Sequence, residues 1–162
     1  MPSVYLILGG NKGKSTEILS TAIDLLTNAI GQKITESSRY ESESWGFQSE
    51  PFVNQIIKLE TSLPPIDVLR CLQQIENQLG RTRNGSRYSD RTIDIDILYY
   101  DSLVVNDPLL SIPHPRIAAR RFVLVPMAEI SPDWTDPVSG MTISEMLKVC
   151  TDNSWVRKLD EY

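Results

Sequence analysis

The sequence predicts an α+β fold, from the residue patterns of its first hundred residues and their order. Four segments have the composition or the alternation typical of strands: residues 4–8, 33–44, 52–60 and 93–97. Two stretches, residues 15–29 and 65–79, carry apolar residues three or four positions apart, which is typical of amphipathic helices. The resulting order is strand, helix, strand, strand, helix, strand. This order is the βαββαβ arrangement of ferredoxin-like folds, with an antiparallel sheet and two helices on one of its faces.

The first strand and helix flank a glycine-rich turn. Val4 to Leu8 is almost fully apolar and ends at Gly9 and Gly10. Ser15 is placed to cap the following helix, and Gly31 stands where a left-handed C-terminal cap is expected. The turn Gly-Gly-Asn-Lys-Gly-Lys-Ser is one residue short of a phosphate-binding P-loop. A small P-loop kinase therefore stays open as an alternative, although the glycine spacing disfavours it.

The second unit contains a polar, edge-type strand at 33–44, an aromatic loop and a further strand. On the strand at 52–60, Phe52 and Asn54 share one face, where an amide can present a donor and an acceptor to a heterocycle. Aromatic residues in the loop at 45–51 can bind a flat ligand or fold back on the core, and both interpretations remain open. Proline at position 65 suits the first turn of the second helix, and Gly80 ends that helix.

The stretch from Gly80 to Asp101 carries the strongest chemical signal. Its loop holds four arginines, at positions 81, 83, 87 and 91, and leads into the alternating run Ile-Asp-Ile-Asp-Ile. Asp94 and Asp96 would share one strand face, with their Cα atoms roughly 6–7 Å apart. Two such carboxylates can bind one or two Mg²⁺-type ions, and adjacent arginines suggest a polyphosphate ligand. The same alternation is also typical of an ordinary half-exposed strand.

The remaining chain predicts additions to this core. A hairpin turn at Asp101 and Ser102 leads into residues 103–105, and residues 118–122 have the pattern of a short helix. A last helix is expected at 143–150 and a short strand at 155–159. The single histidine, His114, lies between two prolines near several arginines. It is either an ordinary loop residue or, given those neighbours, a phosphate ligand.

Composition limits the class of protein. The 162 residues predict one domain, spanning 1–162, with 41% hydrophobic and 23% charged residues. The net charge of −5 argues against nucleic-acid or anionic-membrane partners. The opening residues have no basic stretch, and their apolar run is too short for a signal or a membrane span. Cys71 and Cys150 are expected to be reduced thiols, although one bridge is possible, and a cytoplasmic monomer is the default expectation.

The chain contains, in order, the motifs Gly9-x-Asn11, Gly46, Phe52-x-Asn54, Gln73 to Glu76, Gly80-Arg81-x-Arg83, Arg91-x2-Asp94-x-Asp96, Pro113 to Arg116, Arg120 and Phe122. Taken together, these motifs resemble the 6-hydroxymethyl-7,8-dihydropterin pyrophosphokinases of folate biosynthesis over nearly the whole chain. The Arg-x2-Asp-x-Asp element is highly specific within this ordered set. A third interpretation, a non-catalytic ferredoxin-like ligand-binding module, would have no use for that element.

The resemblance implies transfer of pyrophosphate from ATP to the pterin's hydroxymethyl oxygen, with release of AMP and two Mg²⁺ ions as cofactors. It implies that both metals are held by Asp94 and Asp96. It implies catalytic roles for Arg81, Arg91, His114 and Arg120. It implies nucleotide contacts from Gln73, Glu76, Arg83, Tyr88, Ile97, His114 and Arg120. It implies a pterin slot formed by Ser42, Trp45, Gly46, Phe52, Asn54 and Phe122.

The sequence departs from the family's usual pattern in two loops. Ser42-Glu43-Ser44 stands where many members have a Pro-Pro pair. Tyr88 replaces a common tryptophan, and Ser89-Asp90 replaces the more usual Gly-Pro before Arg91. The two aspartates are present, so catalysis is expected to be retained.

Overall fold

The fold is organised around an antiparallel sheet. The computed structural model describes residues 1–11, 15–43, 51–80 and 93–159. Within these residues the main sheet has six strands in the order β5-β1-β4-β3-β8, and β2 also pairs with β4. The strands are β1 (Ser3–Asn11), β2 (Gly31–Glu36), β3 (Tyr40–Ser42), β4 (Phe52–Thr61), β5 (Asp94–Tyr100) and β8 (Val156–Lys158).

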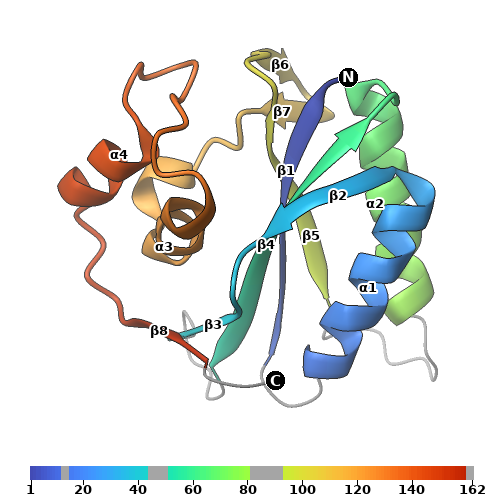
Figure 1. Cartoon of the computed structure of the whole chain (residues 1–162), viewed down its shortest axis with the longest axis horizontal. Coiled ribbons are helices and arrows are strands. Elements are labelled where there is room, and N and C mark those ends of the chain that lie inside the picture. Colours follow the sequence, from blue (N-terminus) through green and yellow to red (C-terminus); the bar gives the residue numbers. More distant parts are fainter. Residues whose placement is uncertain (12–14, 44–50, 81–92, 160–162) are drawn as a thin grey trace.

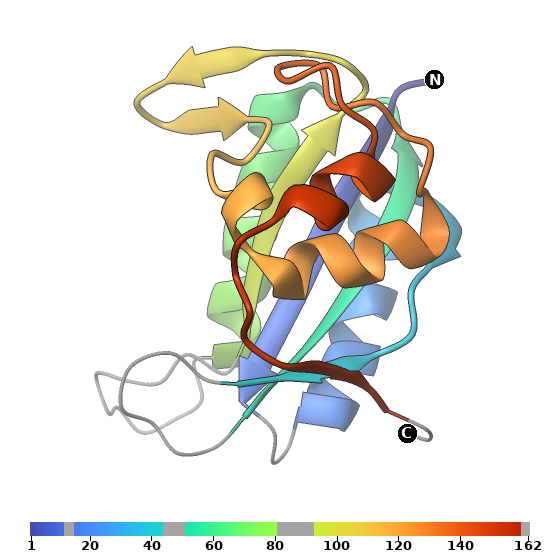
Figure 2. The same ribbon diagram turned by 90° about the vertical axis from the view of Figure 1, so that its left-hand side faces the viewer.

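Helices cover both faces of this sheet (Figure 1). One face carries α1 (Ser15–Ala29) and α2 (Pro65–Gly80), and the other carries α3 (Arg121–Ile130) and α4 (Ile143–Val149). The order β1, α1, β2, β4, α2, β5 is the predicted βαββαβ core, so the α+β, ferredoxin-like prediction is confirmed. Figure 2 looks onto the face beneath α3 and α4.

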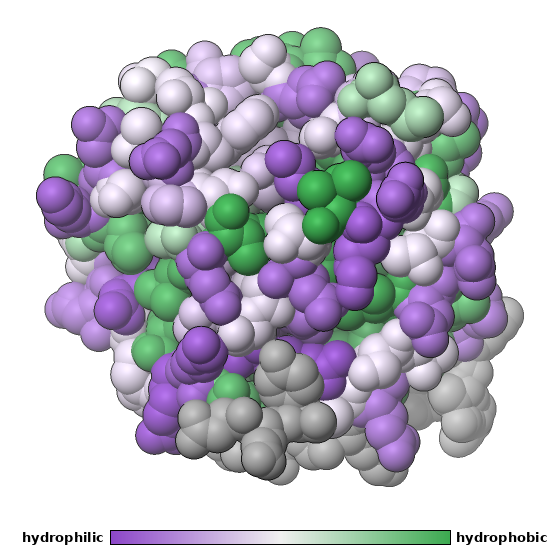
Figure 3. Space-filling view, in the orientation of Figure 1, coloured by the Kyte–Doolittle hydropathy of each residue, from purple (hydrophilic) through white to green (hydrophobic). Residues whose placement is uncertain are grey.

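Strand alternation divides the interior into two cores. Leu6 and Leu8 of β1 point toward α1 and α2, where they join a buried aliphatic cluster. Tyr5 and Ile7 point the other way, into a second cluster beneath α3 and α4. Successive residues of a central strand therefore serve opposite layers, which is why this strand is apolar almost throughout. Hydrophilic residues and small hydrophobic areas are interspersed on the molecular face shown in Figure 3.

A buried hydrogen bond fixes the loop between α3 and α4. The Tyr99 hydroxyl donates to Asp136 Oδ2 at 2.6 Å, and Asp136 Oδ1 accepts from the backbone N–H of Val138 at 2.8 Å. Burial raises the pKa of Tyr99 above its ordinary value, and the neighbouring Asp136 carboxylate raises it further. The tyrosine therefore stays protonated and acts as a donor.

Several boundaries differ from the expectations. The strand expected at 33–44 is two strands, β2 and β3, because β4 is long enough to pair with both. Gly31 is not a left-handed cap: it begins β2, where a Cβ atom would overlap the backbone carbonyl of Glu60. A residue without a side chain is needed here because two strands approach closely, so the expected role of Gly31 as a helix cap was wrong.

The segment after β5 also differs. The expected hairpin from Asp101 into residues 103–105 does not form: β6 (Val105–Asp107) pairs with β7 (Leu110–Ile112) in a separate two-stranded sheet. The short helix expected at 118–122 is a 3-10 turn at Ile117–Ala119 followed by α3. Because α3 and α4 pack on the second sheet face, only one end of that face is left for a site.

Two further expectations concern the membrane and the thiols. No helix in the described ranges is sufficiently long and apolar to cross a membrane. Cys71 and Cys150 are both free, so the possible bridge between them is not formed.

Candidate active site

Three neighbouring strands present side chains to one open end of the sheet. In the ladder, Gly9 of β1 lies opposite Asp94 of β5 on one side and opposite Asn54 of β4 on the other. One step further into the sheet, Ile7 lies opposite Asp96. Residues directly opposite each other in an antiparallel pair share a face. Asp94, Asp96 and Asn54 are therefore brought to one surface by the strand register itself.

This surface forms the floor of a pocket with a volume of about 470 Å³. That size lies within the range typical of small-molecule sites. Its walls come from β1, β4, β5, the loop after β7 and the start of α3. The lining residues are Ile7, Gly9, Gly10, Asn11, Phe52, Asn54, Asp94, Asp96, Leu98, His114, Arg120, Phe122 and Val123.

The alternation of β5 is as predicted. Ile93, Ile95 and Ile97 are buried beneath the helices, whereas Asp94 and Asp96 are exposed on the opposite face. The Asp96 side chain is 53% exposed, and its Oδ2 atom lies 4.0 Å from His114 Nε2. A hard cation would thus meet a hydrated carboxylate rather than one committed to a buried ion pair.

The donor set fits Mg²⁺ in one particular way. Among the residues that the structure describes, no cluster of three or more His, Cys, Asp or Glu side chains could hold a metal ion. Mg²⁺ commonly binds one or two carboxylates and takes its other ligands from water and substrate phosphates. Two carboxylates on an open strand face suit that mode of binding.

His114 is fixed by its own backbone and by its neighbour. Its N–H donates to the carbonyl of Leu98 at 3.1 Å, which ties the loop to β5. Its Nδ1 accepts from the N–H of Arg116 at 3.1 Å, so the neutral ring carries its proton on Nε2 and faces Asp96. Burial lowers the pKa of His114, Arg120 and Arg116 lower it further, and the Asp96 carboxylate opposes them.

Arg120 and Phe122 reach the pocket from the start of α3. The guanidinium carbon of Arg120 lies 5.4 Å from the centroid of the Phe122 ring, which is a cation–π distance. The first turn of α3 is anchored because Arg121 N–H donates to Asp152 Oδ2 at 2.8 Å. The pocket therefore has a cation and an aromatic face on the same wall.

The opposite wall is built around a buried amide. Asn54 is 5% exposed, and its Nδ2 donates to Ser42 Oγ at 3.1 Å. A Cβ atom on Gly9 would overlap Asn54 Oδ1, so the glycine leaves room for this carboxamide. Phe52 lies at the rim and is 38% exposed.

The residues assigned to the nucleotide do not all reach this pocket. Gln73 is exposed on α2, and Glu76 Oε2 accepts from the N–H of Ile95 at 2.6 Å, along the outer edge of β5. Ile97 lies in the core beneath the helices, on the face opposite Asp96. Their contacts with a nucleotide stay a prediction. Six further predicted site residues lie outside the described residues: Trp45, Gly46, Arg81, Arg83, Tyr88 and Arg91.

The structure adds residues that the predicted site did not include. These pocket residues are Ile7, Gly9, Gly10, Asn11, Leu98 and Val123. The glycine-rich turn after the first apolar run could have predicted Gly9 and Gly10 as site residues. The apolar members depend on strand register, which joins residues far apart in sequence.

The position of the two glycines in a strand argues against the P-loop alternative. Gly9 and Gly10 belong to β1 and pair with Asn54 and Val53 of β4. Their amides are part of an extended strand, whereas a P-loop needs the backbone to curl around phosphates.

The sequence is similar to those of known proteins. A family model described as 7,8-dihydro-6-hydroxymethylpterin-pyrophosphokinase (HPPK) matches residues 5–132. A 2-amino-4-hydroxy-6-hydroxymethyldihydropteridine pyrophosphokinase of Porphyromonas gingivalis is 43% identical over 141 residues, which is 85% of this chain and 95% of that protein. The Haemophilus influenzae protein of that name is 36% identical over 159 residues, covering 97% of this chain and 98% of the relative.

A solved structure has the same fold. It is the Plasmodium falciparum HPPK-DHPS wild type with pterin and p-hydroxybenzoate, with a TM-score of 0.76 and 17% identity. The match covers 91% of this chain, and the chain spans 42% of the Plasmodium one.

Proposed function

The chain belongs to the 7,8-dihydro-6-hydroxymethylpterin-pyrophosphokinase family, and we propose that the pocket beside Gly9 is its active site. The enzyme is an ATP-dependent diphosphotransferase of folate biosynthesis. It transfers pyrophosphate from ATP to the hydroxymethyl group of 6-hydroxymethyl-7,8-dihydropterin and releases AMP. One observation carries the assignment of the site. A carboxylate pair, a histidine, an arginine, an amide and two aromatic rings line one pocket.

The transfer requires positioning more than a protein nucleophile. The pterin hydroxyl oxygen attacks the β-phosphorus of ATP, and the hydroxyl proton is released to water. The bond from that phosphorus to the oxygen that bridges to the α-phosphorus breaks, and AMP leaves with that oxygen. Charge develops on phosphate oxygens during this step, so fixed cations and donors supply most of the stabilisation. We assign that role to His114 Nε2–H and the Arg120 guanidinium, because both residues line the pocket.

Asp94 and Asp96 would hold Mg²⁺, and we propose two ions. When bound, such ions neutralise phosphate charge and align the polyphosphate chain. Arg81 and Arg91 would add positive charge from the loop that precedes β5. Gln73, Glu76, Arg83, Tyr88 and Ile97 would contact the nucleotide.

The pterin would occupy the opposite wall. Asn54 offers a donor and an acceptor to the edge of a heterocycle, and its orientation is held by Ser42. Phe122 and Phe52 supply aromatic surface for stacking on a flat ring. Trp45 and Gly46 would complete the slot. A buried amide that is left unpaired costs free energy, so this wall favours a ligand with matching polar groups.

We also propose that the chain is a single catalytic domain that acts as a cytoplasmic monomer. The net charge of −5 supports the absence of nucleic-acid and anionic-membrane partners. Light scattering of the purified chain would test the monomer, and a dimer mass would contradict it.

Calorimetry of nucleotide binding tests the metal assignment apart from turnover. A non-hydrolysable ATP analogue is titrated with and without Mg²⁺ into the wild type, Asp96→Asn and Asp133→Asn. Asp133 is an exposed aspartate of the loop between α3 and α4, and its variant carries the same charge change outside the pocket. The wild type and Asp133→Asn should bind about tenfold more tightly with Mg²⁺, and Asp96→Asn should lose most of that gain. Equal Mg²⁺ dependence in all three would contradict the assignment.

A further inference from the structure

A C-terminal strand lies along the pterin side of the sheet. β8 pairs with β3, with Val156 opposite Ser42 and Arg157 opposite Glu41. On its other side β3 pairs with β4, where Ser42 lies opposite Phe52. β3 has only three residues, so few ladder hydrogen bonds hold it on either side. Without β8 it would be a short edge strand, which is the kind of element that opens easily.

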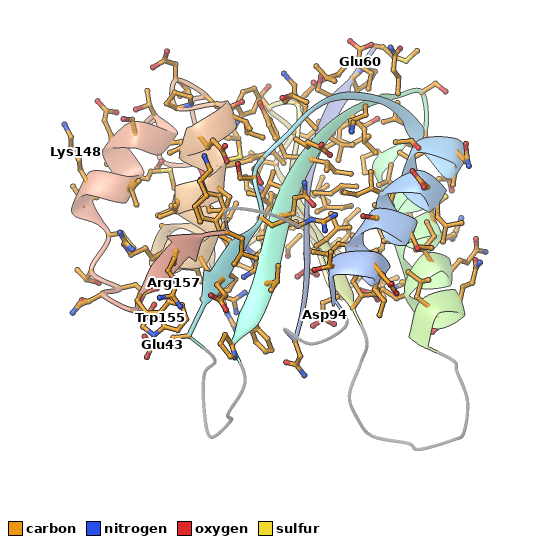
Figure 4. All side chains as sticks on the ribbon, turned by 60° about the horizontal axis from the view of Figure 1, so that its bottom comes forward. Glu43, Glu60, Asp94, Lys148, Trp155 and Arg157 are labelled. Carbon is orange, nitrogen blue, oxygen red and sulfur yellow. The ribbon has the colours of Figure 1, made fainter. Side chains whose placement is uncertain are left out.

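Side chains reinforce this pairing at the end nearest the pocket. The backbone N–H of Trp155 donates to Glu43 Oε1 at 3.1 Å, and the backbone N–H of Glu43 donates to the Trp155 carbonyl at 3.4 Å. The guanidinium carbon of Arg157 lies 4.9 Å from the Trp155 ring centroid. Glu43, Trp155 and Arg157 gather at the end of the sheet that also carries Asp94, far from Glu60 (Figure 4).

An ion pair also links β3 and β8. Arg157 Nη2 donates to Glu41 Oε1 at 3.1 Å. The Glu41 side chain is 4% exposed and that of Arg157 is 66% exposed, so a surface cation is one partner of a buried carboxylate. Removing the cation would take one partner from that carboxylate, which destabilises its place in the strand.

The strand held in this way fixes the pocket amide. Because side chains alternate along β3, Glu41 and Ser42 point to opposite faces, and Ser42 Oγ accepts from Asn54 Nδ2 at 3.1 Å. A displacement of β3 would therefore be transmitted to the carboxamide that lines the pocket. His114, Arg120, Asp94 and Asp96 come from other elements and would stay in place.

We propose that Trp155 and Arg157 are positioning residues that set the affinity for the pterin through β3, Ser42 and Asn54. The inference rests on the function proposed for the pocket. The residues matched by the family model end at 132, so β8 lies beyond them. The expected signature is selective: pterin binding weakens while nucleotide binding does not.

Steady-state kinetics and binding of three variants test this proposal. Arg157→Ala should raise the KM for hydroxymethyldihydropterin about tenfold, because small misplacements of binding groups have large effects. Its Kd for ATP should change by less than about twofold. Arg157→Lys keeps the charge and should restore most of the pterin affinity. Arg70→Ala is the matched control, since Arg70 is 67% exposed and pairs with Asp67 at 3.0 Å on α2.

Amide hydrogen exchange supplies a second readout. Exchange at residues 40–43 should become faster in Arg157→Ala than in the wild type, while exchange in α2 stays unchanged. The proposal is overturned if Arg157→Ala behaves like Arg70→Ala in pterin KM. It is also overturned if pterin and ATP affinities fall together with thermal stability. A wild type that releases no AMP with the pterin would overturn the proposed function and this inference with it. An active wild type with a silent Arg157→Ala would overturn the inference alone.

Discussion

The carboxamide of Asn54 occupies the space where a side chain on Gly9 would otherwise lie. The two residues are direct partners across β1 and β4, and a Cβ atom at position 9 would overlap Asn54 Oδ1. The other end of the amide donates to Ser42 Oγ. Two neighbouring strands thus fix the pocket amide from both sides, one through a hydrogen bond and one by leaving room for it.

Gly9→Ala should weaken pterin binding. The added methyl group forces Asn54 to rotate and give up its bond to Ser42, so we expect the pterin KM to rise about tenfold. Gly31→Ala is the comparison, because its methyl group would overlap the Glu60 carbonyl far from the pocket. That variant should lose about 1–3 kcal/mol of stability without a change in KM. A normal pterin KM in Gly9→Ala would show that the amide does not bind the substrate.

Asp96→Ala should abolish turnover and leave the fold intact. The side chain is 53% exposed, so its loss should move the melting temperature by less than about 2 °C. If it is a ligand of the metal, kcat should fall at least about a hundredfold. Quenched-flow or steady-state assays of AMP release measure this, and full activity in the variant would contradict the site.

Arg91→Ala should lower turnover more than ATP binding. An arginine that meets charge only as it develops contributes to kcat, whereas one that binds the ground state changes both in proportion. Comparing kcat with the Kd for ATP separates these cases. Lys14→Ala is a suitable control and should change kcat and the Kd for ATP very little. A complete loss of ATP binding in this variant would revive the P-loop interpretation.

Glu129→Gln should show that hydrogen bonds between α3 and the start of β3 stabilise the fold in a pH-dependent way. Glu129 accepts from Ser38 N–H at 2.8 Å, Ser38 Oγ at 2.7 Å and Tyr40 OH at 3.0 Å. Burial raises the pKa of Glu129, but these bonds and the charge of Lys158 outweigh it, so the pKa is lowered below 4.5. A lowered folded-state pKa means that the stabilisation is complete above pH 4.5 and is lost as the pH falls through the folded value.

Thermal melting at several pH values measures this effect. At pH 7 the variant should melt about 2 °C below the wild type, a modest figure because the carboxylate is partly hydrated. The difference should shrink as the pH is lowered below the ordinary glutamate value. A difference that is constant with pH would mean that the charge of Glu129 contributes nothing.

Local patterns predicted the elements that build the site. The alternation through Ile93 and Ile97 was enough to place Asp94 and Asp96 on one exposed face, because a strand has only two faces. The helices α1 and α2 were equally predictable, because apolar residues spaced three and four positions apart are typical of an amphipathic helix. These features depend on neighbours in sequence.

Features that depend on long-range pairing were not predictable in this way. Gly31 looked like a helix cap, and only its pairing with Thr61 shows that two backbones meet there. Ile7 joins the pocket through its register with Asp96. The strand expected at 155–159 was confirmed as β8, but its partner β3 lies more than a hundred residues earlier in the chain. No local pattern states which strands will pair.

The product of ATP cleavage distinguishes transfer of pyrophosphate from transfer of a single phosphate. The wild-type chain is incubated with ATP, Mg²⁺ and 6-hydroxymethyl-7,8-dihydropterin, and the nucleotides are identified by ³¹P NMR or mass spectrometry. We expect AMP and a pterin diphosphate in equal amounts, with no AMP when the pterin is omitted. Formation of ADP and a pterin monophosphate would contradict this expectation, because the γ-phosphate alone would then have been transferred.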